Sequence, residues 1–384
     1  MANILAGVDY PSRFATPRVD TFDSVARARI PPLYSVSAKI FGQRLSPVIL
    51  KGLSFPISTA PHDLIHAFNY VPLGTKPYVV SFEGELPRVM NGDVASTSAR
   101  KRLRKHFFSR RCRGLYPISA FALRLLRSYA RDWPEVQEDR FQPQIMYPSI
   151  QRRGRPKQLN KGELVLTFVG GQWARKGGAV CARLSRLLTQ RGLKHCLHII
   201  SSLDHGPHIY TDTSVDFYKS DIDLLRAPEV TLHGAMSNAD ALALMDKSDF
   251  VLLPTLDDSF GFSLLEAMAG GTPCIATRIC AIPEVIDDGQ DGILVDMPCD
   301  ANGRWAHVYE DTPGRLNPAY SEMLDTLFSD LALTIADRLE ALVESGGYEA
   351  MSHQALSKIE TRFDAELMAR RWNDVYAQAL SRNI

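Results

Sequence analysis

The sequence predicts an α/β protein built from two doubly wound parallel sheets. Short apolar runs alternate with helix-like segments, which is the pattern of parallel strands covered by helices. The chain has 384 residues, of which 45% are hydrophobic, so it can bury a large core and form two domains. Charge divides it similarly: residues 1–150 carry 21 Lys and Arg against 11 Asp and Glu, a net +10, and the remainder has 23 against 32, a net −9.

In the first domain, three apolar runs are predicted as strands: DLIHAF (63–68), PYVVSF (77–82) and QIMYPS (144–149). Before residue 60 the signal is poor. The segment QRRGRPKQLNKG (151–162) is polar and basic and has no apolar periodicity, so it is predicted to be the linker.

The second domain gives a cleaner alternation. Its predicted strands are ELVLTFVGG, LHIIS, VTLHG, FVLLP and CIAT, with helices between them. The tail from about Tyr320 is predicted to be helical and to end in the amphipathic segment DAELMARRWNDVYAQAL. This order predicts a second doubly wound sheet.

The densest charge cluster is RKRLRKHFFSRRCR, residues 100–113, with eight Lys or Arg and no acid. In a helix, Leu103, Phe107 and Cys112 would form an apolar strip beside this charge, which suits peripheral contact with an anionic membrane. The alternative is a solvated helix face. Nucleic acid is not expected as a partner, because no recognised nucleic-acid motif accompanies the cluster.

Other features exclude whole classes of protein. No apolar run approaches a membrane span and the first residues lack the pattern of a signal peptide, so a cytoplasmic location is expected. The six cysteines form no Cys-x-x-Cys pair and have no zinc-type His spacing, so we expect free thiols and no structural metal.

The stretch DFVLLPTLDDSFGFSLLEAMAGGTPCIAT, residues 249–277, places an acidic loop between a strand and a helix. In a helix over 261–269, Glu266 falls on the apolar stripe of Phe262, Leu265 and Ala269, where a carboxylate needs a partner. The loop, with Asp258, lies at a strand's carboxyl end, where ligands of such sheets bind, and it leads into a helix N-terminus that favours a phosphate or sugar oxygen. Taken alone, the two acids could also be a helix cap and a buried, hydrogen-bonded Glu.

A second loop of ligand type is FVGGQWARKGG, residues 168–178. Its glycines, Gly170 and Gly171 among them, allow close backbone approach, and Arg175 and Lys176 offer positive charge to a diphosphate. It is not a P-loop, because the required residue order is absent. The alternative is a surface turn whose cations face water.

Three segments, in order and spacing, resemble the retaining GT-B glycosyltransferases of glycosyltransferase family 4. They are GGQWARKGG, PTLDDSFGFSLLEAMAGGTPCIAT and PEVIDDGQDGILVD (283–296), and the resemblance is strongest over residues 163–300. It implies a GT-B architecture: two facing Rossmann-like domains, with a C-terminal helix crossing back to the first. The domains would be residues 1–152 and 160–365, with the helix at 366–384.

The resemblance also implies roles for individual residues. Lys176, with Arg175, would hold the donor diphosphate, Glu266 would bond the ribose, and Asp258 would touch the transferred sugar. The loop around Gly261, namely Ser259, Phe260, Gly261 and Phe262, would support phosphate or sugar oxygens, and no metal ion would be needed.

The sequence departs from the family at three of these positions. Gly171 stands where an Arg is usual, Asp258 replaces a Glu, and Glu83 in PYVVSFEGELPR takes the place of a His near the reacting carbon. For Glu83 the alternative is a surface residue at a strand end.

The predicted function is transfer of a hexose-type sugar from a nucleoside-diphosphate-sugar, a UDP or GDP sugar, to a hydroxyl of a glycan or lipid-linked glycan. The resemblance implies retention of configuration. The alternatives are a nucleotide-sugar epimerase on the same fold and a non-catalytic domain that binds a nucleotide-sugar or glycan.

Overall fold

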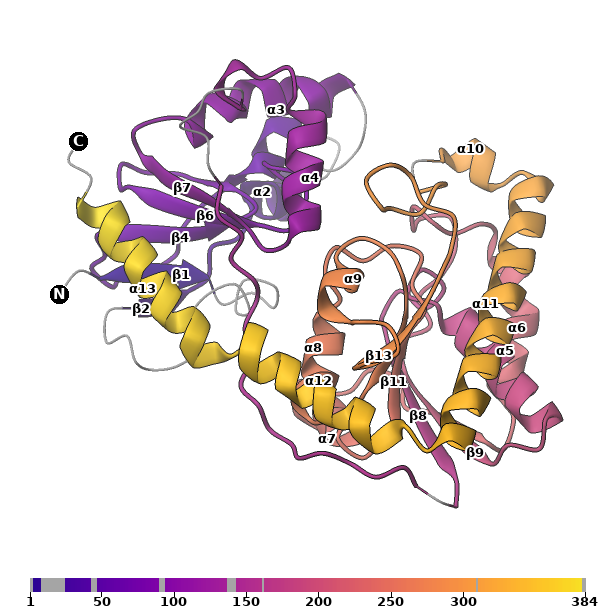
Figure 1. The fold of residues 1–384 in the computed structure, drawn as a ribbon. Coiled ribbons are helices and arrows are strands. Elements are labelled where there is room, and N and C mark those ends of the chain that lie inside the picture. The colour runs from indigo at the N-terminus through magenta and orange to yellow at the C-terminus, as the bar shows by residue number, and fades with distance from the viewer. Residues whose placement is uncertain are drawn as a thin grey trace. The chain divides into compact units, whose positions relative to one another are not determined.

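The computed structural model describes residues 3–7, 25–42, 47–89, 94–136, 143–160, 162–308 and 310–381. The chain divides into two compact units (Figure 1). Unit 1 comprises Met1–Gln151 together with Arg362–Ile384, and unit 2 comprises Arg152–Thr361.

Unit 1 has a five-stranded parallel sheet in the order β2-β1-β4-β6-β7. Numbered along the chain this is the order 2-1-3-4-5, which is one of the two common doubly wound arrangements. Its strands are β1 (Ile4–Gly7), β2 (Val25–Ala28), β4 (Leu64–Phe68), β6 (Tyr78–Phe82) and β7 (Cys112–Pro117), and a separate pair joins β3 (Leu53–Ser54) to β5 (Val71–Pro72). Its helices are α2 (Leu33–Phe41), η2 (Val48–Gly52), α3 (Val94–Phe107), α4 (Ala120–Tyr129), η3 (Pro134–Val136) and α13 (Ala365–Ser381).

The two faces of this sheet pack against different helices because side chains alternate along a strand. Tyr78 and Val80 of β6 face the core that contains Phe107 of α3 and Leu126 of α4. Val79, between them, faces a second core that α13 completes. The C-terminal helix therefore packs on the first domain's sheet, as predicted.

Unit 2 has a six-stranded parallel sheet in the order β10-β9-β8-β11-β12-β13. Its strands are β8 (Leu164–Val169), β9 (His195–Ile200), β10 (Val230–Leu232), β11 (Phe250–Leu253), β12 (Cys274–Thr277) and β13 (Gly292–Val295). Its helices are α5 (Gly178–Gln190), η4 (Val215–Tyr218), α6 (Lys219–Leu224), α7 (Asn238–Met245), α8 (Phe262–Ala269), α9 (Ile282–Val285), α10 (Thr312–Arg315), α11 (Pro318–Ser345) and α12 (Tyr348–Arg362).

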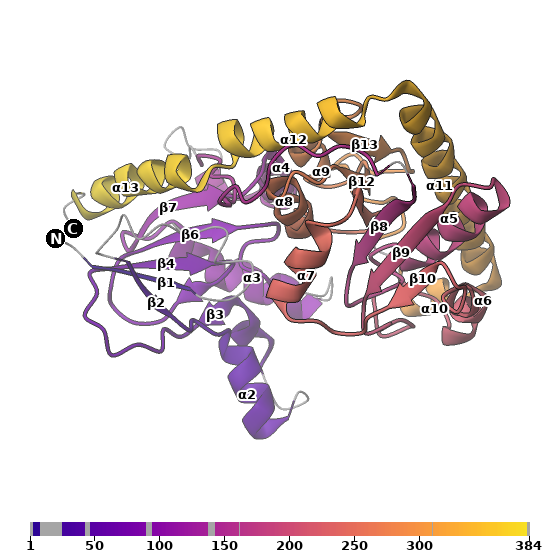
Figure 2. The same ribbon diagram turned by 90° about the horizontal axis from the view of Figure 1, so that it is seen from below.

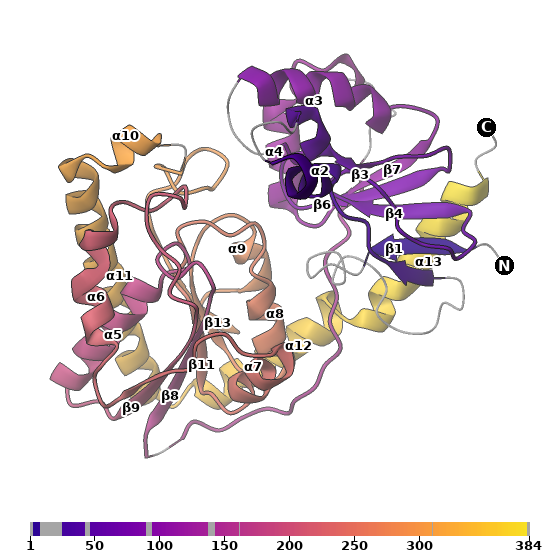
Figure 3. The same ribbon diagram turned by 180° about the vertical axis from the view of Figure 1, so that it is seen from behind.

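Helices cover both faces of the unit 2 sheet. Helices α5, α6 and α11 lie on one side of it, and α7, α8 and α12 lie on the other, in the front view and in the view from behind (Figures 1 and 3). The sheet order corresponds to 3-2-1-4-5-6, the dinucleotide-binding arrangement, whose order reverses between β8 and β11.

Some sequence predictions for unit 1 are wrong. Residues 144–149 form no strand, and Pro143 and Pro148 on either side of Met146 cannot donate ladder hydrogen bonds. Met146 is instead fully buried in the core against α13. Strands β1 and β2 and helix α2 lie before residue 60, where the sequence pattern predicts no clear element, and Figure 2 shows α2 projecting away from the unit 1 sheet.

The basic cluster also differs from its prediction. Helix α3 ends at Phe107, so Cys112 lies on β7 and not on the helix. Leu103 and Phe107 are buried within unit 1, because the apolar side of α3 packs on the domain's own core. The predicted apolar strip is thus not exposed beside the charge. None of the helices in the described part of the chain combines the length and apolar composition that a membrane span requires.

Candidate functional site

The two loops of ligand type follow adjacent strands of unit 2. The glycine turn follows β8 and the acidic loop follows β11, and these strands pair in parallel, Val251 opposite Thr167. They are also the strands between which the sheet order reverses. Ligands of such sheets bind at this point, beyond the carboxyl ends of the strands.

Close backbone packing holds the glycine turn against the acidic loop. Gly177 has φ +90°, and a Cβ there would lie 2.0 Å from the carbonyl oxygen of Pro254. Only glycine fits both conditions. A Cβ on Gly170 would lie 2.7 Å from the Cβ of Lys176 in the same turn, whereas a Cβ on Gly171 would have no neighbour within 4 Å.

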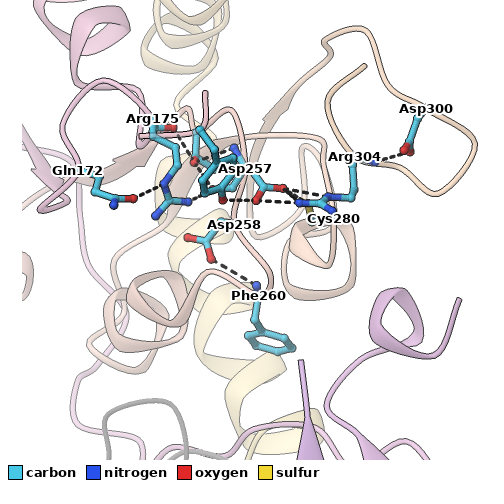
Figure 4. A network of polar contacts seen from close by, with 10 residues as sticks. Gln172, Arg175, Asp257, Asp258, Phe260, Cys280, Asp300 and Arg304 are labelled. Atoms are coloured by element: carbon cyan, nitrogen blue, oxygen red, sulfur yellow. Dashed lines mark hydrogen bonds and ion pairs between the residues drawn. The ribbon is translucent and has the colours of Figure 1, made fainter. Parts of the chain in front are cut away.

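The Arg175 side chain points from the turn into the acidic loop (Figure 4). Its Nε donates to Gln172 Oε1 over 2.5 Å, its Nη1 donates to the carbonyl oxygen of Asp257, and its guanidinium lies over the Tyr210 ring, 5.7 Å from the centroid. The backbone joins the loops too, since Leu256 N donates to Arg175 O over 2.8 Å.

Lys176 forms an ion pair with Asp258, Nζ to Oδ2, and the two side chains are 20% and 11% exposed. Burial alone would raise the pKa of the Asp258 carboxyl, but Lys176, Arg175 and the Gly261 amide outweigh burial and hold this pKa below its usual value. Asp258 is therefore a carboxylate at neutral pH. The alternative that both cations face water is wrong, because both are part-buried and engaged.

Asp258 also organises the loop that precedes α8. Its Oδ1 accepts from Phe260 N over 3.3 Å and from Gly261 N over 3.1 Å. Two of the amides predicted to face a ligand thus donate to this carboxylate, because an Asp side chain is short enough to bond the amides two and three residues on. Phe260 is fully buried with its ring 5.4 Å from that of Phe262, and Ser259 is half-buried.

Glu266 is buried in α8, with 4% of the residue exposed, and its Oε1 accepts from Asn238 Nδ2 over 3.2 Å. The helix begins at Phe262, one residue later than predicted, and it ends at Ala269 as predicted. The apolar surface is wider than the predicted stripe, since every residue of α8 except Ser263 is buried.

Comparison with known proteins shows what this region is similar to. Residues 163–307 match the family model described as glycosyl transferases group 1, and this segment is called the group 1 domain below. The chain is also 32% identical over 171 residues to the D-inositol 3-phosphate glycosyltransferase of Arthrobacter sp. (strain FB24), which is 43% of this chain and 38% of that relative. The chain spans about two fifths of the length of this relative.

Solved structures extend the likeness beyond the group 1 domain. The chain is similar to the sucrose-phosphate synthase of Thermosynechococcus elongatus, with a TM-score of 0.58 and 13% identity over 96% of this chain and 88% of that one. It is also similar to Anabaena HepE in complex with UDP and glucose, with a TM-score of 0.53 and 13% identity over 92% and 86% of the two chains. At this identity the likeness shows the fold alone. The predicted α/β class and GT-B architecture are confirmed.

Outside the group 1 domain, the predicted Glu83 belongs to unit 1. It follows β6, is 5% exposed, and forms an ion pair with Arg88. Asn69 also makes two hydrogen bonds with Glu83. Its Nδ2 donates to Glu83 Oε1 over 3.3 Å, and its Oδ1 accepts from Glu83 N over 3.1 Å. The alternative of a surface residue is wrong, because the carboxylate is buried and paired.

The group 1 domain also contains site residues that sequence reasoning missed. Asp257, next to Asp258, is buried and accepts from Tyr210 Oη over 2.6 Å and from Arg304 Nη2 over 3.2 Å. Asn238, the partner of Glu266, begins α7. The two adjacent aspartates of the loop could have indicated Asp257, whereas no local sequence pattern indicates Tyr210 or Arg304.

Proposed function

We propose that the chain is a glycosyltransferase that moves a sugar from a nucleoside-diphosphate-sugar, a UDP or GDP sugar, to a hydroxyl of a glycan or lipid-linked glycan. The observation that carries the proposal is the ion pair of Lys176 and Asp258 at the reversal point of the group 1 domain. It sets a cation for the diphosphate beside a carboxylate for the sugar, within one loop pair.

The roles follow from charge and position. Lys176 and Arg175 supply positive charge for a diphosphate, whose charge would compete with Asp258 for the Lys176 ammonium. Glu266, with Asn238 fixing one of its oxygens, would accept from ribose hydroxyls. Asp258 would accept from hydroxyls of the transferred sugar.

Three further parts of the proposal concern the reaction itself. Arg175, Lys176 and the α8 N-terminus can together offset the charge of the leaving group, so we propose turnover without a metal ion. Turnover that persists in EDTA would support this, and loss of turnover that Mg²⁺ restores would contradict it.

We also propose that the reaction retains the configuration of the sugar and that Glu83 acts near the reacting carbon. The anomeric configuration of the product tests the first proposal, and the turnover of a Glu83→Gln variant tests the second. The cytoplasmic location and the peripheral contact of residues 100–113 with anionic lipid stay predictions.

The decisive experiment measures binding of UDP, GDP and their sugars by calorimetry. Lys176→Ala should weaken both the nucleoside diphosphate and the donor roughly 10- to 100-fold, because a hydrogen bond to a charged group contributes about 1.5 to 3 kcal/mol. The matched control is Lys219→Ala, which removes a lysine whose ion pair with Asp216 is exposed and should leave binding unchanged. Equal nucleoside-diphosphate binding by Lys176→Ala and the parent would overturn the site assignment.

Two further variants separate the sugar from the nucleotide. Glu266→Gln should weaken both ligands, because both contain the ribose. Asp258→Ala should abolish transfer with a smaller effect on nucleoside-diphosphate affinity, since its proposed contact is with the sugar. A parent that interconverts two nucleotide-sugars without an acceptor would instead be an epimerase, and one that binds donor without turnover would be a binding protein.

A further inference from the structure

Asp257 is a buried carboxylate that the roles above leave unused. The residue is 7% exposed, and its oxygens accept from Tyr210 Oη (2.6 Å), Arg304 Nε (3.3 Å), Arg304 Nη2 (3.2 and 3.3 Å) and Cys280 Sγ (3.5 Å). A buried charge requires such partners, and the bidentate arginine fixes the direction of the carboxylate.

Asp257 is connected to Arg175 in two ways. The carbonyl oxygen of Asp257 accepts from Arg175 Nη1, and the ring of Tyr210, whose hydroxyl Asp257 holds, lies beneath the Arg175 guanidinium. Figure 4 shows Asp257 between Arg175 and Arg304. A continuous chain of contacts therefore joins Arg304 to Arg175 through Asp257 and Tyr210.

The backbone around Arg304 is held independently of its side chain. Asp300 Oδ1 accepts from Arg304 N over 2.9 Å, and Gly303 O accepts from Cys280 N over 2.6 Å. Trp305 is fully buried. Replacing only the guanidinium should thus leave the course of this loop intact.

We propose that Arg304 and Asp257 are a positioning pair for nucleoside-diphosphate recognition, which acts by holding Arg175 in the orientation that meets the diphosphate. This inference rests on the proposed function. It adds Arg304, from a loop outside the glycine turn and the acidic loop, to the residues that determine donor affinity. Neither residue needs to touch the ligand.

The experiment is a double-mutant cycle between Arg304 and Arg175 in the full chain, with UDP and GDP titrated by calorimetry. Arg304→Gln should lose roughly 10-fold in nucleoside-diphosphate affinity, as expected for residues coupled through shared contacts. In an Arg175→Gln background the same change should have almost no further effect. Arg304→Lys, which keeps the charge beside Asp257, should recover part of the affinity.

The matched control is Arg278→Gln on the neighbouring loop, where the arginine pairs with Asp288 and Asp296. It should bind as the parent does. If Arg304→Gln does not fold, Tyr210→Phe serves as the second variant. It removes only the hydroxyl that donates a hydrogen bond to Asp257, and it keeps the aromatic ring beneath Arg175.

The outcomes separate the two proposals. If the parent binds neither nucleotide, the proposed function fails and the positioning pair fails with it. If the parent binds and Arg304→Gln binds equally well, the positioning pair alone is refuted. Equal losses with and without Arg175 would also refute it, because a merely structural change weakens binding whichever side chain stands at position 175.

Discussion

Replacing Asp221 with Asn should destabilise unit 2 by about 3 kcal/mol. Asp221 accepts from Arg183 through both oxygens, over 2.7 and 3.0 Å, and the two side chains are only 3% and 7% exposed. Breaking a buried pair by removing one charge costs about 3 to 5 kcal/mol. We expect the lower end, because Arg183 keeps a second carboxylate, Asp325, at 2.9 Å, and Ser329 at 2.9 Å.

The same helix supplies a matched control. Asp223, two residues on, pairs with Arg226 at 3.5 Å, and those side chains are 64% and 82% exposed. Asp223→Asn should therefore cost under about 1 kcal/mol. Scanning calorimetry of the full chain should show the transition of unit 2 lowered by roughly 6 to 12 °C in Asp221→Asn, at about 2 to 4 °C per kcal/mol for a unit of this size. If the two variants melt within 2 °C of each other, burial does not set the strength of this pair.

Three further predictions concern backbone fit and pH. Gly177→Ala should destabilise the chain far more than Gly192→Ala, because both have a positive φ but only Gly177 would press a Cβ onto Pro254; denaturant unfolding compares the two. Burial lowers the pKa of Lys157 to about 8, so the folded chain binds this proton less tightly than the unfolded chain, and the parent should gain stability over Lys157→Met as pH rises from about 8 towards 10.5. Burial raises the pKa of Asp212 to about 6 from 3.8, so its contribution to stability is fully present below pH 3.8 and is lost as pH rises through 6. The unfolding free energy of the parent relative to Asp212→Asn should therefore fall by roughly 2 kcal/mol between pH 4 and 7.

The sequence predicted those parts of the site that local order determines. The strand, loop and helix around Asp258 and Glu266 follow one another within a few turns of chain, so periodicity and glycine placement were sufficient to find them. Asp257 depends on Tyr210, 47 residues before it, and on Arg304, 47 residues after it, and no local pattern marks such partners. Long-range packing, which overrides local signals, brings them together.

The same limit explains the errors in unit 1. Strand β1 has only four residues, ILAG, and its burial follows from neighbours on both sides and not from alternation in its own sequence. The run 144–149 is apolar for a different reason, because Met146 fills the core beneath α13 without joining the sheet. Apolar content indicates burial, whereas strand formation also requires donors that pair.

The adjacent carboxylates of Asp257 and Asp258 show how one loop can pair with two cationic side chains and still keep its own hydrogen bonds. The two carboxylates point in different directions (Figure 4). Of their cationic partners, Arg304 follows the loop in the sequence and Lys176 precedes it. Each carboxylate also fixes a neutral group: Asp257 holds the Tyr210 hydroxyl, and Asp258 holds two loop amides. A ligand that draws Lys176 away from Asp258 would therefore leave that carboxylate with its amide donors and the Asp257 contacts intact. If the chain binds a diphosphate as proposed, only the Lys176 ammonium would have to change partner, and a site preorganised in this way would favour the charge of the diphosphate over water.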